Sequence, residues 1–293
     1  VMTLAQLIPI ALQLSMAIVI FCVALNAHFD DVSYLLSRSG LLLRSLVSML
    51  VVMPAFAIGL ALAFDLNHAV EIAMVASALS PVPPILPGKQ IKAGGQASYV
   101  IGLLMISALV AVVYVPLAGH LLSTVFHRPV QVDVGNVVTI VATSMLLPVL
   151  AGMCVRRFAP AWADRIHKPA SIFGTVLLVF ALIPVLIKEW PAIHGIIGNF
   201  SVVAMIVFAL VGLAVGHWLG GPDPDNRSVL AMATSARHPA VALAITHNAA
   251  DQPGVMAAVL LVLVVSSIVS GPYVKWRQRS HEAEPADGHS QIS

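Results

Sequence analysis

Two segments carry the residues whose types could do chemistry inside an otherwise apolar chain. Residues 79–96, "LSPVPPILPGKQIKAGGQ", hold four prolines and two lysines. Residues 226–249 hold Arg237, His238 and Pro239 in a row. Prolines break helices and leave carbonyls without their helical donors. Arginine suits carboxylate, sulfonate or phosphate, and histidine titrates near neutral pH. The two segments together predict a binding site for an anion, with His238 as a candidate carrier of a coupling proton.

The composition places these segments in a membrane. Hydrophobic residues make up 59% of the 293 residues and charged residues only 10%, whereas a soluble domain has about 25% charged residues. The net charge of +2 is too small to favour nucleic acid as a partner, so membrane lipid is the expected surrounding. The two cysteines lie far apart in apolar segments, which predicts neither a disulfide nor a metal site.

Nine segments are apolar enough to span the membrane as helices, which takes about 20 residues each. They are residues 7–26, 41–64, 68–94, 97–125, 134–155, 168–188, 192–219, 227–250 and 253–274. The predicted fold is an all-α membrane domain over residues 1–275, followed by a polar tail over residues 276–293. Its parts are a first half (7–125), a linking span (134–155) and a second half (168–274).

The third and eighth spans are predicted to be broken helices. The structural breaks are Pro81, Pro83, Pro84, Pro87 and Gly88 in the third span, and Pro239 in the eighth. Each broken span follows two spans and precedes one, and an odd number of spans separates the two sets of four. The sets are therefore inverted relative to each other. Secondary transporters have this architecture, and they bind substrate where the broken helices meet.

Basic residues set the expected orientation. Placing the C-terminus in the cytoplasm keeps most loop cations there, namely Arg38, Arg44, Arg156, Arg157, Arg165, Lys168, Arg227, Lys275, Arg277 and Arg279. Only Arg128 and Lys188 then lie near loops on the other side. The sequence therefore predicts a multi-pass protein of the cell (inner) membrane with its N-terminus on the side opposite the cytoplasm.

Arg237 lies ten residues from Arg227 and ten from His247, so it falls near mid-membrane. A charge there costs about 2.5–3.5 kcal/mol and must face a cavity or a partner. The predicted substrate-binding residues are Arg237, His238, Thr234 and Ser235 from the eighth span, and Lys89, Gln90 and Gln96 from the third.

Each of these residues also has a structural interpretation, which stays open. Arg237 could be a plug that binds the carbonyls freed by the prolines. His238 could be an interior histidine with its hydrogen bonds satisfied. Lys89 could lie at the cytoplasmic mouth, and Thr234 and Ser235 could bond only their own helix.

At both broken segments the chain resembles the bile acid:sodium symporter family, within the bile/arsenite/riboflavin transporter superfamily. Residues 79–96 align without gaps with the family's "CCPGGTASNVMTYLARGN", with Pro81 on the motif proline. Residues 232–245, "MATSARHPAVALAI", align with "EVGMQNSGLAAALA". The resemblance implies two helix groups, called core and panel, and alternating-access transport of an organic anion such as a bile acid, another sulfonate, pantoate or a keto acid. It resembles members that lack the extra N-terminal helix of ten-span relatives.

The departures from the family pattern concern sodium. The positions that carry the family's sodium ligands hold Leu86, Pro87, Met232 and Ala236 here. Sodium prefers oxygen ligands, so the usual sodium sites are expected to be absent. Backbone carbonyls with Thr234, Ser235 or Gln90 leave a weak sodium site open, and a proton remains the other coupling ion. Neither a cofactor nor a resident metal is expected.

Rival functions follow from the same residues. The main alternative is an anion channel or uncoupled facilitator, in which a positive constriction selects charge without coupling. An enzyme is not expected, because the chain lacks H-E-x-x-H, G-x-S-x-G and a pair of intramembrane aspartates. A sensor is disfavoured by the lack of a soluble signalling domain.

Overall fold

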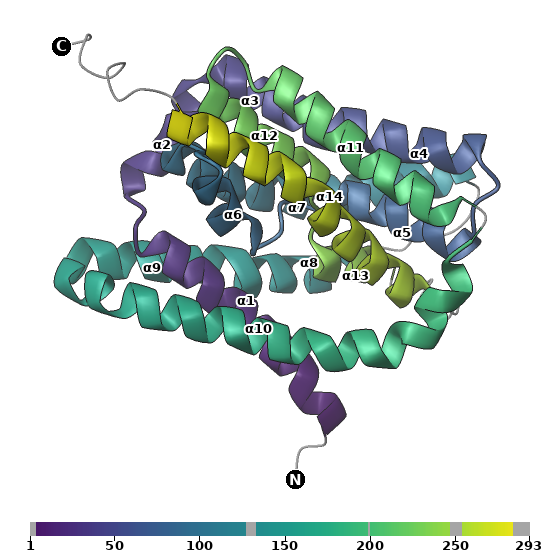
Figure 1. The fold of residues 1–293 in the computed structure, drawn as a ribbon, viewed down its shortest axis with the longest axis horizontal. Helices are drawn as coiled ribbons and strands as arrows, with labels where there is room; N and C mark the ends of the chain where they lie inside the picture. The colour runs from purple at the N-terminus through teal and green to yellow at the C-terminus, as the bar shows by residue number, and fades with distance from the viewer. Residues whose placement is uncertain (1–3, 127–132, 199, 247–253, 284–293) are drawn as a thin grey trace.

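A computed structural model of the chain describes residues 4–126, 133–198, 200–246 and 254–283, and every regular element in them is a helix (Figure 1). The helices are α1 (Leu4–Ala24), α2 (Phe29–Ser37), α3 (Ser39–Val47), α4 (Met53–Ala63), α5 (His68–Leu79), α6 (Leu86–Lys92), α7 (Ala97–Phe126), α8 (Val134–Val141), α9 (Leu147–Phe158), α10 (Pro160–Ile196), α11 (Ser201–Leu219), α12 (Pro224–Ser235), α13 (Pro239–Ile245) and α14 (Val255–Ala283). Short π-helical turns join α3 to α4 (Ser48–Val52) and α8 to α9 (Ala142–Leu146).

Seven helical segments of the described chain are long and apolar enough to cross a membrane. They are Ser39–Ala63, Ala97–Gly119, Val134–Phe158, Pro160–Ile196, Ser201–Leu219, Pro224–Ile245 and Val255–His281. Large apolar side chains also point outward, as on α10, where Phe180 and Ile187 are 70% and 69% exposed. Outward apolar surface of this extent suits lipid. The prediction of an all-α membrane protein is therefore confirmed.

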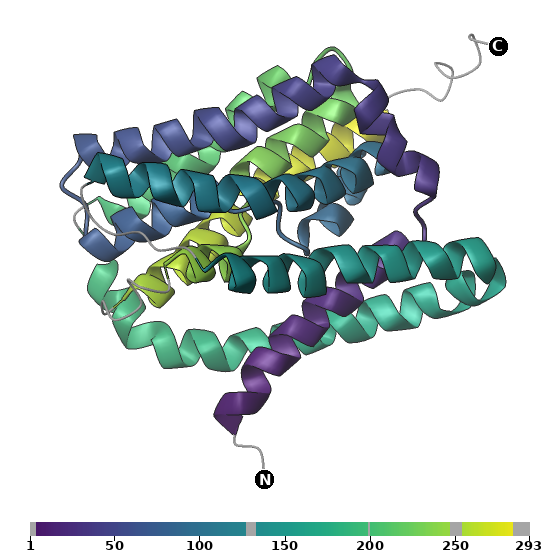
Figure 2. The ribbon, with the colours of Figure 1, turned by 180° about the vertical axis from the view of Figure 1, so that it is seen from behind.

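The helices form two layers, which both ribbon views separate (Figure 1, Figure 2). In the first layer, α1 crosses α10 and the α8–α9 segment and packs against both. The second layer is a helix bundle in which α11 packs on α12 and α14, and α5 packs on α4 and α14. Helix α13 contacts both layers, since it packs against α5 and α8.

Glycines allow α11 and α12 to approach closely. A Cβ on Gly212 would lie 2.7 Å from the Cα of Ser235, and one on Gly216 would lie 2.5 Å from the Cα of Ala231. Small residues at such positions let helix backbones touch inside a membrane.

The third span breaks between Ser80 and Ile85. Helix α5 ends at Leu79 and α6 starts at Leu86, so the break contains Pro81, Pro83 and Pro84. Pro87 lies in the first turn of α6, where a missing N–H costs nothing, and Gly88 follows it within the helix.

The eighth span breaks over residues 236–238. Ala236 and His238 are extended, with φ −102° and −79°, and Pro239 is the first residue of α13. A helix cannot easily continue into a residue that precedes proline, which accounts for the position of the break.

Two expected boundaries differ from the structure. Helix α10 continues through Pro191 to Ile196, past the end predicted at residue 188, and α11 begins at Ser201 after Phe200, which has φ 60°. One proline removes one hydrogen bond, which a membrane helix packed on neighbours tolerates. Helix α14 extends to Ala283, past the start expected for the polar tail at residue 276. Residues 284–293 and Arg128 lie outside the described residues.

Candidate functional site

The two helix breaks touch through their main chains. The His238 N–H donates to the Pro81 carbonyl at 3.0 Å and to the Ser80 Oγ at 2.9 Å. Ser80 Oγ in turn donates to the Ser77 carbonyl at 2.8 Å. The third and eighth spans are thus joined where each stops being helical.

Arg237 lies at this junction with 4% of its surface exposed. Its Nη1 donates to the Ser80 carbonyl at 3.4 Å, and its Nη2 donates to the Met49 carbonyl at 3.4 Å and the Thr234 carbonyl at 3.1 Å. Its Nε has no partner. Among the described residues, no carboxylate pairs with this guanidinium.

Proline and helix ends explain why these carbonyls are free. Met53 N–H bonds to the Ser48 carbonyl in π-helical fashion, and the next residue, Pro54, has no N–H for Met49 or Leu50. The Met49 carbonyl accepts from Arg237 instead, and the Leu50 carbonyl accepts from the Tyr114 hydroxyl at 2.6 Å.

The other two carbonyls follow the same logic. Ser80 lies just past α5, and Pro84, four residues on, has no N–H. Thr234 is in the last turn of α12, and the N–H four residues on belongs to His238, which bonds across to the other break. The last carbonyls of any helix lack helical donors, so Arg237 satisfies groups that the fold leaves open.

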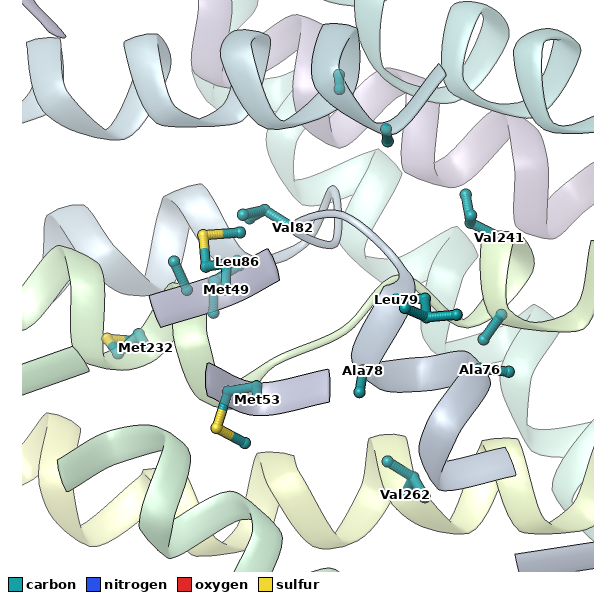
Figure 3. Close-up of a cluster of buried hydrophobic side chains, with 14 of the residues drawn as sticks. Met49, Met53, Ala76, Ala78, Leu79, Val82, Leu86, Met232, Val241 and Val262 are labelled. Atoms are coloured by element: carbon teal, nitrogen blue, oxygen red, sulfur yellow. The ribbon is translucent and has the colours of Figure 1, made fainter. Parts of the chain in front are cut away.

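Apolar side chains enclose the junction. Met49, Val82, Leu86 and Met232 belong to one buried cluster around the breaks (Figure 3). Four positions correspond to the family's sodium ligands. Three of them are buried, namely Leu86, Pro87 and Met232, and the fourth, Ala236, is partly buried. Their side chains supply no oxygen, so carbonyls and hydroxyls are the polar groups here.

The hydroxyls of α12 bind within the protein. Thr234 Oγ1 lies 3.1 Å from Ser48 Oγ, which links α12 to the turn between α3 and α4. Ser235 Oγ donates to the Met232 carbonyl of its own helix at 3.1 Å. Both residues are at most 1% exposed.

A small cavity borders Arg237 and gathers positive charge. Its volume of about 20 Å³ leaves room for about one water molecule. Its polar lining consists of Arg237, Lys89 and the hydroxyl side chains of Ser266, Ser267 and Ser270 on α14. Lys89 is partly buried, whereas Lys92 is exposed. Two cations and no carboxylate line this cavity, which makes it suitable for an anion.

The two glutamines lie apart from Arg237. Gln90 is 1% exposed, and its Nε2 donates to the Val229 carbonyl at 2.8 Å, which ties α6 to α12. Gln96 accepts a hydrogen bond from the Tyr34 hydroxyl. It lines a separate cavity of about 570 Å³ with Asp223, Asp225 and His281, at the ends of α12 and α14.

His238 lies where the two layers meet. The residue is fully buried, its Nε2 is 3.2 Å from Ser144 Oγ, and its Nδ1 has no partner. Ser144 belongs to the π-helical turn between α8 and α9, in the first layer. His238 therefore joins the broken-helix junction to the opposite layer.

Sequence reasoning missed several partners at the junction. They are Ser48, Ser80, Tyr114, Ser144 and the three α14 serines. One signal was present, since "SMLVVMP" begins at Ser48 and "SMLLP" begins at Ser144. In both, a serine and a π-helical turn precede a proline.

Among the described residues, no group of three or more His, Cys, Asp or Glu side chains could hold a metal ion. A metal ion at the junction would thus depend on main-chain carbonyls and hydroxyl side chains.

Comparison with known families gives one match. A model described as the Sodium Bile acid symporter family matches residues 13–195. The match covers well over half of the chain, from within α1 to near the end of α10, and includes the first broken span. It confirms the predicted family resemblance. The search of curated proteins returned no match.

Proposed function

This chain belongs to the sodium bile acid symporter family, and from this premise we propose that it carries a small or medium-sized organic anion across the membrane as a secondary active transporter. The observation behind the proposal is the buried Arg237, placed where two broken helices meet and beside a cavity that also contains Lys89. Broken helices in transporters line substrate sites at mid-membrane. Family members are transporters, which agrees with a function other than catalysis.

The nine-span inverted repeat is the architecture we propose for this activity. Seven candidate spans are accompanied by two shorter apolar helical segments, Ile10–Ala24 and His68–Leu79. Counting these two supports nine passes, with breaks in the third and eighth. Spans one to four would then repeat as spans six to nine with opposite orientation.

Alternating access would come from movement between the two layers. A cavity of about 20 Å³ admits about one water molecule and no organic anion. The structure is thus consistent with a state closed around Arg237. Contacts between the layers include the side-chain pair Ser144–His238 at the junction, so separating the layers would expose His238 and the break.

Sodium fits poorly at the junction while Arg237 is present. The three carbonyls there already receive its N–H groups, and a second cation beside a guanidinium would be repelled. We therefore propose coupling to protons, with His238 as the carrier, because histidine changes charge near neutral pH.

We propose that the protein lies in the cell (inner) membrane with its C-terminus in the cytoplasm. Arg277 near the end of α14 lies 3.7 Å from Asp225 at the start of α12, and Arg44 approaches the α11–α12 turn at Gly221. Cations near the ends of separate helices thus gather at one end of the bundle, as the positive-inside rule requires. The test uses Ser280→Cys in a background without Cys22 and Cys154. An impermeant maleimide added to intact cells should leave this cysteine unlabelled, and labelling of intact cells would contradict the orientation.

The first experiment is a binding screen of detergent-purified protein against organic anions, read as melting temperature. A ligand that binds the folded state raises the melting temperature by mass action. Lys89→Gln and Lys92→Gln form a matched pair, since only Lys89 lines the cavity. We expect an anion-specific rise that Lys89→Gln weakens several-fold and Lys92→Gln leaves unchanged.

Transport of the anion found in this screen is then measured in liposomes. Uptake accelerated by unlabelled anion on the far side identifies a carrier, whereas flux without such counterflow identifies the alternative, an anion channel or uncoupled facilitator. The absence of any anion-induced rise, together with equal behaviour of the two lysine variants, would contradict the proposal.

A further inference from the structure

We infer that the guanidinium of Arg237 occupies a cage of main-chain carbonyls that holds a free monovalent cation once this side chain is removed. Arg237 would then act as a tethered cation that makes the junction independent of sodium, whichever solute the protein carries.

The cage consists of three carbonyl oxygens from segments far apart in the sequence. Ser80, Met49 and Thr234 each present one oxygen to the guanidinium. None of the three oxygens is used by a helical N–H donor, because of Pro84, Pro54 and the end of α12, respectively. Carbonyls freed in this way are the groups that coordinate cations in transporters with broken helices.

Two helix ends add to the negative potential of the cage. Ser80 follows directly after α5, and Thr234 lies in the last turn of α12. The C-terminal end of a helix carries about half a negative charge. Two such ends pointing at one buried place, with no carboxylate pairing among the described residues, favour one positive charge there.

The guanidinium fits the cage loosely. Its distances to the three oxygens are 3.1, 3.4 and 3.4 Å, longer than the usual value of about 2.9 Å, and its Nε has no partner. Neutral oxygens also lie near, since the Thr234 and Ser48 hydroxyls are 3.1 Å apart on segments that form the cage. Neutral oxygen ligands of this kind suit a hard monovalent cation.

Removing the charge should therefore create a dependence on salt that the natural chain lacks. In Arg237→Gln and Arg237→Met, three buried carbonyls lose their charged partner. Leaving buried polar groups unsatisfied destabilises a fold, and a cation that binds only the folded state restores the stability.

The test compares melting temperatures of the wild type, Arg237→Gln, Arg237→Met and Lys89→Gln in sodium, potassium and choline chloride at equal ionic strength and without any organic anion. Lys89→Gln is the matched control, because it also removes a cation that is partly buried beside the cavity, and Lys89 donates to none of the three carbonyls. We expect that the melting temperature of the wild type is the same in all three salts, and that the melting temperature of Lys89→Gln is likewise independent of the salt. Both Arg237 variants should melt several degrees lower in choline, and sodium should restore most of the loss in a saturable way.

Three outcomes would overturn the inference. The first is a wild-type protein that sodium stabilises specifically, since Arg237 would then not make the chain independent of sodium. The second is a pair of folded Arg237 variants that melt equally in all salts. The third is a pair of variants that fold in none of the salts while Lys89→Gln folds, since the cage would then need the arginine side chain itself. These melting temperatures are measured without an organic anion, so they do not depend on finding a transported anion. The test of the carbonyl cage and the test of transport can therefore fail separately.

Discussion

The main-chain N–H of His238 and the main-chain carbonyl of Pro81 are 3.0 Å apart and join the breaks of the third and eighth spans. Each break supplies what the other lacks, since one has a spare donor and the other a spare acceptor. Buried main-chain groups must be paired inside a membrane, where water is absent. The contact therefore stabilises both breaks, and the two broken helices should move as one unit.

The hydroxyl of Ser80 strengthens this contact, so Ser80→Ala should destabilise the protein. Ser80 Oγ accepts from the His238 N–H at 2.9 Å, and losing one such bond costs about 1 kcal/mol. The melting temperature in detergent measures the loss. The control is Ser107→Ala, because Ser107 is equally buried but bonds only to the Leu104 carbonyl of its own helix. Equal losses for the two variants would contradict a special role for the junction.

The approach of α11 to α12 predicts a large cost for Gly216→Ala. The added Cβ would lie 2.5 Å from the Cα of Ala231, a backbone atom that cannot rotate away. Overpacking of this kind costs about 1–3 kcal/mol. Gly59→Ala on α4 is the control, because nothing lies within 4 Å of its new Cβ. Alanine also favours helix over glycine, so the melting temperature of Gly59→Ala should be unchanged or higher.

Arg237→Lys tests whether the planar guanidinium matters beyond its charge. Arg237 reaches three carbonyls through two nitrogens, whereas lysine presents one ammonium at the end of a flexible chain. The loss of one charge-assisted hydrogen bond to the bound anion, about 1.5–3 kcal/mol, should lower kcat/KM for anion uptake by about tenfold or more. Uptake into liposomes with equal protein content checks this. Arg157→Lys, at an exposed position, should transport like the wild type, and wild-type transport by Arg237→Lys would argue against a direct role.

Proton coupling predicts a selective defect in His238→Gln. Glutamine keeps a polar group near Ser144 Oγ, which lies 3.2 Å from His238 Nε2, but it cannot gain a proton. Uptake by the wild type should rise when an inward proton gradient is imposed, and this rise should vanish in the variant. The anion-induced shift in melting temperature should persist, which separates coupling from binding. Gradient-driven uptake that survives in His238→Gln would exclude His238 as the carrier.

The lack of oxygen side chains at the positions of the family's sodium ligands, Leu86, Pro87, Met232 and Ala236, predicts sodium-independent transport. Replacing external sodium by potassium at fixed pH and ionic strength should leave the initial rate of wild-type uptake unchanged, because Arg237 already satisfies the carbonyls of the junction. Inverting only the sodium gradient is the complementary measurement. A steep dependence on sodium in either experiment would contradict this prediction.

Local chemistry made part of this protein predictable from its sequence. Proline acts on its own helix, so the positions of the breaks followed from Pro81, Pro83, Pro84 and Pro239. Hydropathy depends on composition alone, so the membrane class followed as well. The cost of a charge at mid-membrane is likewise independent of the fold, and it required Arg237 to have buried partners.

Which partners those are was decided by packing between segments far apart in the chain. The packing of the π-helical turn Ser48–Val52 on α12 and the contact between the two helix breaks determined that Arg237 binds the Met49 and Ser80 carbonyls, and the meeting of the two layers placed Ser144 against His238. Packing between helices also placed Gln96 against Tyr34, away from Arg237. Helix α10 continues through Pro191. A single sequence reveals which donors and acceptors lack local partners, but the pairing among them is a property of the assembled helices, because each hydrogen bond needs two groups brought within about 3 Å.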